Sequence, residues 1–86
     1  MGQDTLIKML SSQGRILYAL STGSKSLGEL ITSTKLSTGT IYYNIKELIL
    51  RGLVIKVEKG RYAITEKGLQ VLRRIISELE VSIPPR

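Results

Sequence analysis

The fold is decided by residues 26–48, which read SLGELITSTKLSTGTIYYNIKEL and combine two helix starts with apolar residues at helical spacing. Ser26 stands three residues before Glu29, which is the form of a capping box at a helix N-terminus. The apolar residues that follow predict a short helix over about 27–33. A tight connection at residues 34–36 then leads to a second helix start.

The second helix start is Ser37, a favoured N-cap residue. From there the pattern predicts a longer helix over about 38–51. Gly52 follows at the position where a glycine in the left-handed conformation often ends a helix. The apolar residues of this helix form one stripe, which consists of Ile41, Ile45, Leu48 and Ile49. Because the stripe must face the core, the remaining residues lie at the surface or on the flanks.

The hydrophobic period changes after Gly52 from that of a helix to that of a strand. Residues 53–58 and 61–64 alternate around a Lys59-Gly60 turn, which predicts an antiparallel hairpin. The expected register pairs Glu58 with Arg61, Val57 with Tyr62 and Ile55 with Ile64. This register predicts one wholly apolar face and a cross-strand charge pair on the other face.

Further helices flank this central part. Residues 4–11 and about 13–21 carry apolar side chains at helical spacing, as two helices or as one kinked helix. A final helix is expected to begin after the N-cap Thr65 and to end near Glu80. The predicted fold class is therefore α+β and mainly α, with three helices, a two-stranded hairpin and a C-terminal helix.

The length of 86 residues allows one domain, residues 1–86, with a core over about 12–80 and a frayed tail at 81–86. The chain contains no cysteine and no histidine, which excludes disulfides, most transition-metal sites and imidazole catalysis. Its seven carboxylates are scattered singly. We therefore expect no catalytic residues, no cofactor and no metal site.

The 13 Lys and Arg residues outnumber the 7 Asp and Glu residues, which gives a net charge of +6. Such an excess favours a polyanionic partner, with nucleic acid as the first candidate, while the alternative is a basic chain that is charged for solubility alone. No apolar run approaches the roughly 18 residues of a membrane span. No basic segment followed by an apolar one marks a secretory signal, and we expect a cytoplasmic protein with no membrane partner.

The order of these elements resembles a winged helix-turn-helix. Residues 26–31 look like the first helix of the motif, and residues 36–48 look like its turn and recognition helix. Residues 51–54 resemble the segment that leads into the wing. Residues 62–68 resemble the second wing strand and the "Leu-Thr-x-x-Gly" start of the next helix. The resemblance covers about residues 12–80. Over this range the chain is similar to small prokaryotic, archaeal and viral regulators of the arsenic-repressor and multiple-antibiotic-resistance types.

The resemblance implies that the second helix of the motif lies in the major groove of double-stranded DNA. The candidate DNA contacts on it are Ser37, Thr38, Gly39, Thr40, Tyr42, Tyr43 and Lys46. Ser37 and Thr38 would bind phosphate, and Thr40 and Tyr43 would reach base edges. As alternatives, Ser37 serves only as an N-cap, and one of the two tyrosines packs inside the protein. Asn44 could read adenine, but we expect it to be solvated.

The wing adds three basic candidates, which are Lys56, Lys59 and Arg61. A hairpin tip rich in Lys and Arg suits contacts with phosphates or with the minor groove. The alternative is that these charges only protect exposed strand edges from aggregation.

The terminal helices are the expected dimer interface. The candidate residues are Leu6 and Leu10 near the N-terminus and Leu72, Ile75, Ile76 and Leu79 in the last helix. Their apolar stripes pack either within one chain or across a two-fold axis. The leading hypothesis is thus a sequence-specific, homodimeric transcription regulator that binds double-stranded DNA. The alternatives are a protein-interaction module and a non-specific nucleic-acid-binding protein.

Overall fold

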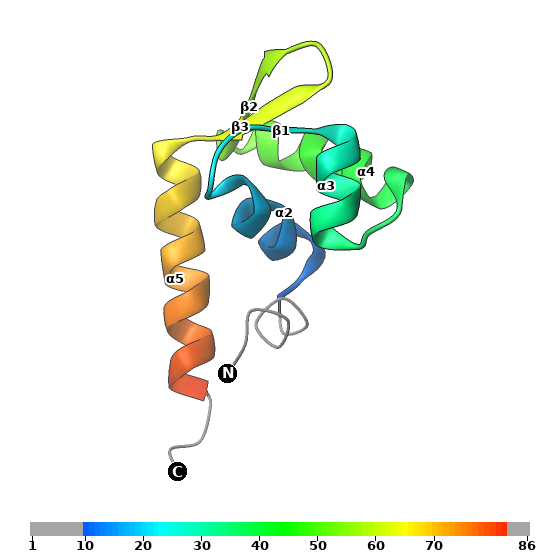
Figure 1. Cartoon of the computed structure of the whole chain (residues 1–86). Helices are drawn as coiled ribbons and strands as arrows, with labels where there is room; N and C mark the ends of the chain where they lie inside the picture. The colour runs from blue at the N-terminus through cyan, green and yellow to red at the C-terminus, as the bar shows by residue number, and fades with distance from the viewer. Residues whose placement is uncertain (1–9, 83–86) are drawn as a thin grey trace.

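The computed structural model describes the backbone of residues 10–82 and the side chains of residues 10–79. Its elements, labelled in Figure 1, are α2 (Ser12–Leu20), β1 (Lys25–Ser26), α3 (Leu27–Thr34), α4 (Thr38–Leu50), β2 (Val54–Glu58), β3 (Arg61–Ile64) and α5 (Glu66–Ser82). This order confirms the predicted mainly helical α+β fold. The helix expected over 4–11 lies almost entirely outside the described residues.

Hydroxyl side chains begin the helices, as the sequence predicts. Ser26 forms the complete capping box: its Oγ accepts from the Glu29 N–H at 3.2 Å, and Glu29 Oε1 accepts from the Ser26 N–H at 2.9 Å. Ser37 Oγ accepts from the Thr40 N–H at 3.2 Å at the start of α4. Thr65 Oγ1 accepts from the Gly68 N–H at 3.0 Å at the start of α5. Each bond satisfies a backbone donor that has no partner inside its helix.

A buried threonine sets the tight turn between α3 and α4. Thr34 is 1% exposed, and its hydroxyl donates to the Leu30 carbonyl at 2.6 Å while accepting from the Leu36 N–H at 3.2 Å. Lys35 ends α3 in the left-handed conformation, with φ of 60°. The chain can therefore reverse direction within three residues without leaving a buried polar group unpaired.

The hairpin register differs from the prediction at all but one pair. Glu58 faces Arg61 as expected, but a bulge at Val57 then pairs Lys56 with Tyr62, Ile55 with Ala63 and Val54 with Ile64. The predicted pairs Val57–Tyr62 and Ile55–Ile64 are therefore wrong. The bulge gives β2 one extra residue, so Val54 is 1% exposed while Ile55 and Val57 are 49% and 47% exposed. The wholly apolar face that the predicted register implies, with Val57 opposite Tyr62 and Ile55 opposite Ile64, therefore does not form.

A third strand, β1, was not predicted. It pairs antiparallel with β3, Lys25 facing Tyr62 and Ser26 facing Arg61, which gives the sheet order β1-β3-β2. Two residues are too few to show strand periodicity in a sequence. The strand matters because it joins the hairpin directly to the start of α3, as Figure 1 shows.

Mostly aliphatic residues from each of the described helices build the core. Its members include Ile16, Leu17 and Leu20 of α2, Leu30 of α3, Ile41, Ile45 and Leu48 of α4, Leu53 and Val54 around β2, Tyr62 of β3 and Leu72 of α5. Ile49, the fourth residue of the predicted α4 stripe, is 38% exposed. None of the helices described between residues 10 and 82 combines the length and apolar character that a membrane span requires.

Among the glycines that the structure describes, Gly68 leaves the least space for a side chain. A Cβ at this position would overlap with the Leu53 carbonyl oxygen and come within 2.7 Å of Ile64 Cγ1. We expect Gly68→Ala to lower the free energy of unfolding by about 1–3 kcal/mol, because the start of α5 would have to move off the base of the hairpin. Chemical denaturation of the two proteins measures this loss.

Gly28→Ala is the matched control, because a Cβ at Gly28 meets no atom within 4 Å. Since alanine favours a helix over glycine by about 0.5–1 kcal/mol, Gly28→Ala should leave stability unchanged or raise it. Equal stability of the Gly68→Ala and Gly28→Ala proteins would show that the contact with Leu53 is not tight.

Candidate nucleic-acid interface

The exposed side of α4 carries polar and aromatic residues, while its inner side carries the core stripe. Lys46 is exposed, Tyr42 is 46% exposed and Tyr43 is 66% exposed. Ile41 and Leu48, on the other side of the helix, are 0% exposed. Tyr42, Tyr43 and Lys46 are therefore at the surface, and they project from a helix whose orientation the core fixes.

The N-terminal end of α4 is open to solvent. Thr38 and Gly39 are exposed, and a Cβ at Gly39 would meet no atom within 4 Å, so packing inside the chain does not require a glycine there. The backbone N–H groups of the first helical residues point out of the helix without intrahelical partners. Together with the positive end of the helix dipole, they form a surface suited to an anion such as a phosphate.

The hydroxyls of Ser37 and Thr40 are partly engaged with each other. Ser37 Oγ donates to Thr40 Oγ1 at 2.9 Å, and it accepts from the Thr40 N–H. Ser37 is therefore the N-cap of α4, as the sequence predicts. Thr40, Tyr43 and Lys46 follow one another at three-residue spacing and so share one side of α4. Because Thr40 is half-buried, Tyr43 and Lys46 supply most of the exposed surface on that side.

The structure contradicts one alternative and one expectation for α4. The alternative was that one of the two tyrosines packs inside the protein, but Tyr42 and Tyr43 are both exposed. The expectation was that Asn44 is solvated. Asn44 is 9% exposed, and its Nδ2 donates to the Thr40 carbonyl at 2.8 Å. Its spacing of three residues from Ile41 and four from Leu48 places it on the inner face.

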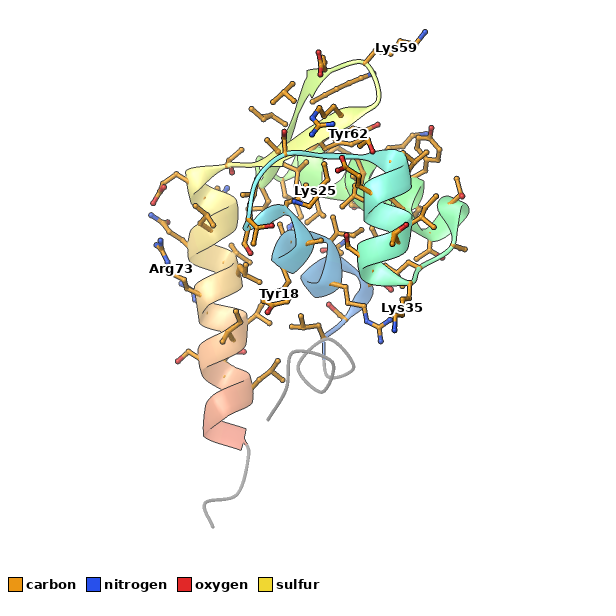
Figure 2. The ribbon with its side chains drawn as sticks, in the orientation of Figure 1. Tyr18, Lys25, Lys35, Lys59, Tyr62 and Arg73 are labelled. Carbon is orange, nitrogen blue, oxygen red and sulfur yellow. The ribbon has the colours of Figure 1, made fainter. Side chains whose placement is uncertain are left out.

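The three basic residues of the hairpin differ in their surroundings. Lys56 and Lys59 are exposed, and Figure 2 shows Lys59 at the tip, pointing away from the body of the protein. Arg61 instead has partners within the chain. Its Nε donates to Ser24 Oγ at 3.1 Å, and its NH1 donates to Glu29 Oε1 at 3.3 Å. The sequence could not reveal these partners, because they lie 37 and 32 residues away.

Glu29 is stabilised in its charged form. The Ser26 backbone N–H has the largest effect in lowering the pKa of Glu29, followed by the Ser26 hydroxyl, while Arg61 and Lys25 add smaller effects. Partial desolvation opposes these effects. The capping box and the ion pair with Arg61 therefore share one carboxylate.

The expected dimer residues divide into two groups. Leu10 and Leu72 are only 5% and 4% exposed within a single chain, so their side chains are already covered. Ile75, Ile76 and Leu79 are half-buried, and in Figure 1 the C-terminal part of α5 extends beyond the rest of the fold. Leu6 lies outside the described residues.

One hollow lies away from α4, where α2, β1 and α3 meet, with a volume of about 400 Å³. Tyr18 and Lys25, which Figure 2 labels, line it together with hydroxyl residues. These polar groups bond within the chain: Ser21 Oγ donates to the Tyr18 carbonyl at 2.6 Å, and Lys25 Nζ donates to Thr22 Oγ1 at 3.1 Å. Over the described part of the chain, no three His, Cys, Asp or Glu residues gather in a way that could hold a metal ion.

Comparison with known proteins identifies this architecture. A family model described as a winged helix-turn-helix matches residues 9–81. No curated protein matches the sequence. The family model thus covers α2 to α5, including the exposed face of α4 and the hairpin.

Several solved structures share the fold. BpsR of Bordetella bronchiseptica, described by the regulation of its DNA binding by 6-hydroxynicotinic acid, superposes with a TM-score of 0.76 at 22% identity over 85% of this chain and 56% of its own. A MarR-family transcriptional regulator from Silicibacter pomeroyi gives 0.68 at 24% identity over 96% of this chain and 64% of its own. YodB of B. subtilis gives 0.66 at 22% identity over 99% and 98%. This chain therefore spans less than two thirds of the first two proteins.

The stability of the α3 start should depend on pH through Glu29. Because the pKa of Glu29 is lowered in the folded protein, its charge stabilises the fold above the usual carboxyl range, and this stabilisation is lost as the pH falls through the lowered pKa. Glu29→Gln keeps a side chain that can complete the capping box but has no charge. The difference in unfolding free energy between the two proteins should therefore shrink as the pH falls below about 4.5.

Glu58→Gln is the control for removing one negative charge, because Glu58 forms no ion pair with any residue that the structure describes. A difference between wild type and Glu29→Gln that stayed constant down to pH 2 would contradict the assignment.

Proposed function

Because the chain belongs to the winged helix-turn-helix family, we propose that it is a transcription regulator that binds double-stranded DNA in a sequence-specific manner as a homodimer. The observation that carries this proposal is the division of α4. Its inner side is fixed by the core, and its outer side presents two exposed tyrosines and a lysine behind an open helix N-terminus. The net charge of +6 suits a polyanionic partner.

In the proposed complex, α4 enters the major groove with its N-terminal end first. The exposed N–H groups at Thr38 and Gly39 bind a phosphate at the groove edge. Tyr43 and Lys46 lie one helical turn apart on the same face and reach the base edges. Tyr42 flanks this face and contacts the sugar-phosphate backbone.

The hairpin contacts the DNA beside the major groove. Lys56 and Lys59 supply positive charge there, and both are exposed. Phosphate contacts of this kind fix the orientation of the protein on the duplex without reading sequence. Base recognition is thus assigned to α4 and backbone recognition to the hairpin.

A homodimer places two copies of α4 on one DNA site. The C-terminal part of α5 is the proposed interface, through Ile75, Ile76 and Leu79, with Leu6 near the other end of the chain. Two copies of α4 about 34 Å apart would then read the two halves of a pseudo-palindromic site.

Exposed tyrosines favour a second candidate function. Tyr42 and Tyr43 could stack on unpaired bases, and Lys46 could bind the adjacent phosphate, in a protein that binds single-stranded nucleic acid without sequence preference. Selection from random duplex DNA separates the two functions. Recovery of a palindrome supports the regulator, and tighter binding to single strands without a recovered sequence supports the alternative.

Tyr43→Ala should lose about 1–3 kcal/mol of binding free energy on the selected duplex and little on random duplex, because only the former depends on base contacts. Thr40→Ala should have a smaller effect of the same kind, because the Thr40 hydroxyl is partly engaged by Ser37. Titration of both duplexes, with thermal unfolding to check the fold, measures this. Equal losses on both duplexes would assign Tyr43 to the DNA backbone instead.

Leu79→Glu should convert the dimer into a monomer of 9.6 kDa, because a charge cannot be buried unpaired in an apolar interface. Sedimentation equilibrium at micromolar concentration measures the mass. Gln70→Glu adds the same charge to an exposed position of α5 and should remain dimeric. Wild-type protein that sediments as a monomer would remove the dimer from the proposed function.

A further inference from the structure

Arg61 lies where three segments of the chain meet. It belongs to β3, and its guanidinium bonds to the loop before β1 and to the first turn of α3. Nε and NH2 donate to Ser24 Oγ and to the Ser24 carbonyl at 3.1 and 3.4 Å, and NH1 donates to Glu29 Oε1 at 3.3 Å. The planar guanidinium thus holds two partners from different elements in one fixed geometry.

Backbone hydrogen bonds also attach the β3 side of the hairpin to the junction of β1 and α3. Ser26 pairs with Arg61 in the sheet, and the Leu27 N–H donates to the Gly60 carbonyl at 3.2 Å. Because Gly60 belongs to the turn between β2 and β3, the tip of the hairpin is tied to the first residue of α3. β2 is the outer strand and has no strand beyond it in the described sheet. The orientation of the hairpin therefore depends on the short contact between β3 and the β1–α3 junction.

The surroundings of Arg61 are unsuited to a direct phosphate contact. The side chain of Arg61 is 36% exposed and that of its partner Glu29 is 51% exposed, so any phosphate that approached Arg61 would also approach a carboxylate. To bind a phosphate fully, Arg61 would have to give up bonds to Ser24 and Glu29. Lys59, two residues earlier, meets neither obstacle, because no carboxylate lies within ion-pair distance of it in the described structure.

We propose that Arg61 is a positioning residue: it fixes the hairpin against α3, and so sets where Lys59 lies relative to α4, without itself contacting DNA. This inference rests on the proposed DNA-binding function for its consequence, while the attachment itself is a property of the free protein. The bonds to Ser24 and Glu29 tie the hairpin to the first helix of the helix-turn-helix. That helix packs with α4 around the shared core.

Whether one substitution, Glu29→Gln, strengthens or weakens DNA binding distinguishes a positioning role of Arg61 from a direct contact with DNA. Glu29→Gln removes a negative charge beside the DNA site, so electrostatics alone predicts tighter binding to duplex DNA. Positioning predicts the opposite, because Arg61 loses its ionic partner while glutamine still caps α3. We expect Glu29→Gln to weaken binding by about two- to fivefold, the range of an exposed ion pair. Tighter binding by Glu29→Gln would overturn the proposal.

Salt dependence gives a second criterion. Lys59→Ala should reduce the slope of log K against log salt concentration by about 0.9, the value for one lost phosphate contact. Arg61→Ala should weaken binding at least as much as Glu29→Gln but change the slope by far less. The double variant should bind no more weakly than Arg61→Ala alone, because both changes break the same attachment. A slope change of about 0.9 for Arg61→Ala, with additive effects, would identify Arg61 as a phosphate contact.

Hydrogen exchange in the free protein tests the attachment without DNA. The Leu27 amide, bonded to Gly60, should exchange about two- to fivefold faster in Arg61→Ala and Glu29→Gln, in keeping with one exposed ion pair. It should be unchanged in Lys59→Ala. If the wild type binds no duplex DNA, the proposed function fails, and this measurement alone decides whether Arg61 holds the hairpin. Unchanged exchange in Arg61→Ala would overturn the attachment.

Discussion

The contact between the start of α5 and the end of α4 determines how the rest of the molecule is arranged. The chain leaves α4 at Gly52 and returns at Thr65, whose hydroxyl donates to the Gly52 carbonyl at 2.7 Å and whose N–H donates to the Leu53 carbonyl at 3.0 Å. Gly68 then packs directly on Leu53. Because the two ends of the hairpin are joined in this way, the base of β2 and β3 is held next to the end of α4. The contacts of Arg61 and Gly60 with the β1–α3 junction then hold the rest of the hairpin.

Most of the fold could be predicted because its signals are local. The Ser26 capping box, the Ser37 and Thr65 caps and the glycine after α4 each act over three or four residues, and each is present as predicted. The strand register could not be predicted in the same way. A bulge at Val57 shifts every pair beyond Glu58–Arg61, and the core selects Val54 rather than Ile55 for burial. Which side of a strand is buried depends on neighbours far along the chain.

In the candidate site, too, features that depend on local sequence could be predicted and features that depend on distant residues could not. Helical periodicity separates Tyr43 and Lys46 from the core stripe, because the period of one helix determines which of its residues face the core and which face solvent. The same periodicity places Asn44 on the inner face, three residues from Ile41 and four from Leu48, although its side chain is polar. The partners of Arg61 could not be predicted from the sequence, because they lie 37 and 32 residues away. Composition counts Arg61 as one positive charge among 13, whereas the fold pairs it with Glu29 and leaves Lys59 as the charge at the hairpin tip.

This distribution of charge bears on how the proposed complex would gain affinity and specificity. On the exposed side of α4, from Thr38 to Leu50, Lys46 is the single basic side chain, and hydroxyls, phenols and backbone N–H groups make up most of the remaining polar surface. Neutral groups of this kind release few counterions, so they add little to the salt-dependent part of binding. In the proposed complex, that part would come from the hairpin lysines and from the overall charge of +6. The attachment of the hairpin to α3 would then hold the charges that supply affinity in a fixed position relative to the neutral groups of α4 that would read sequence. Non-specific attraction would in this way bring α4 to the groove in one orientation.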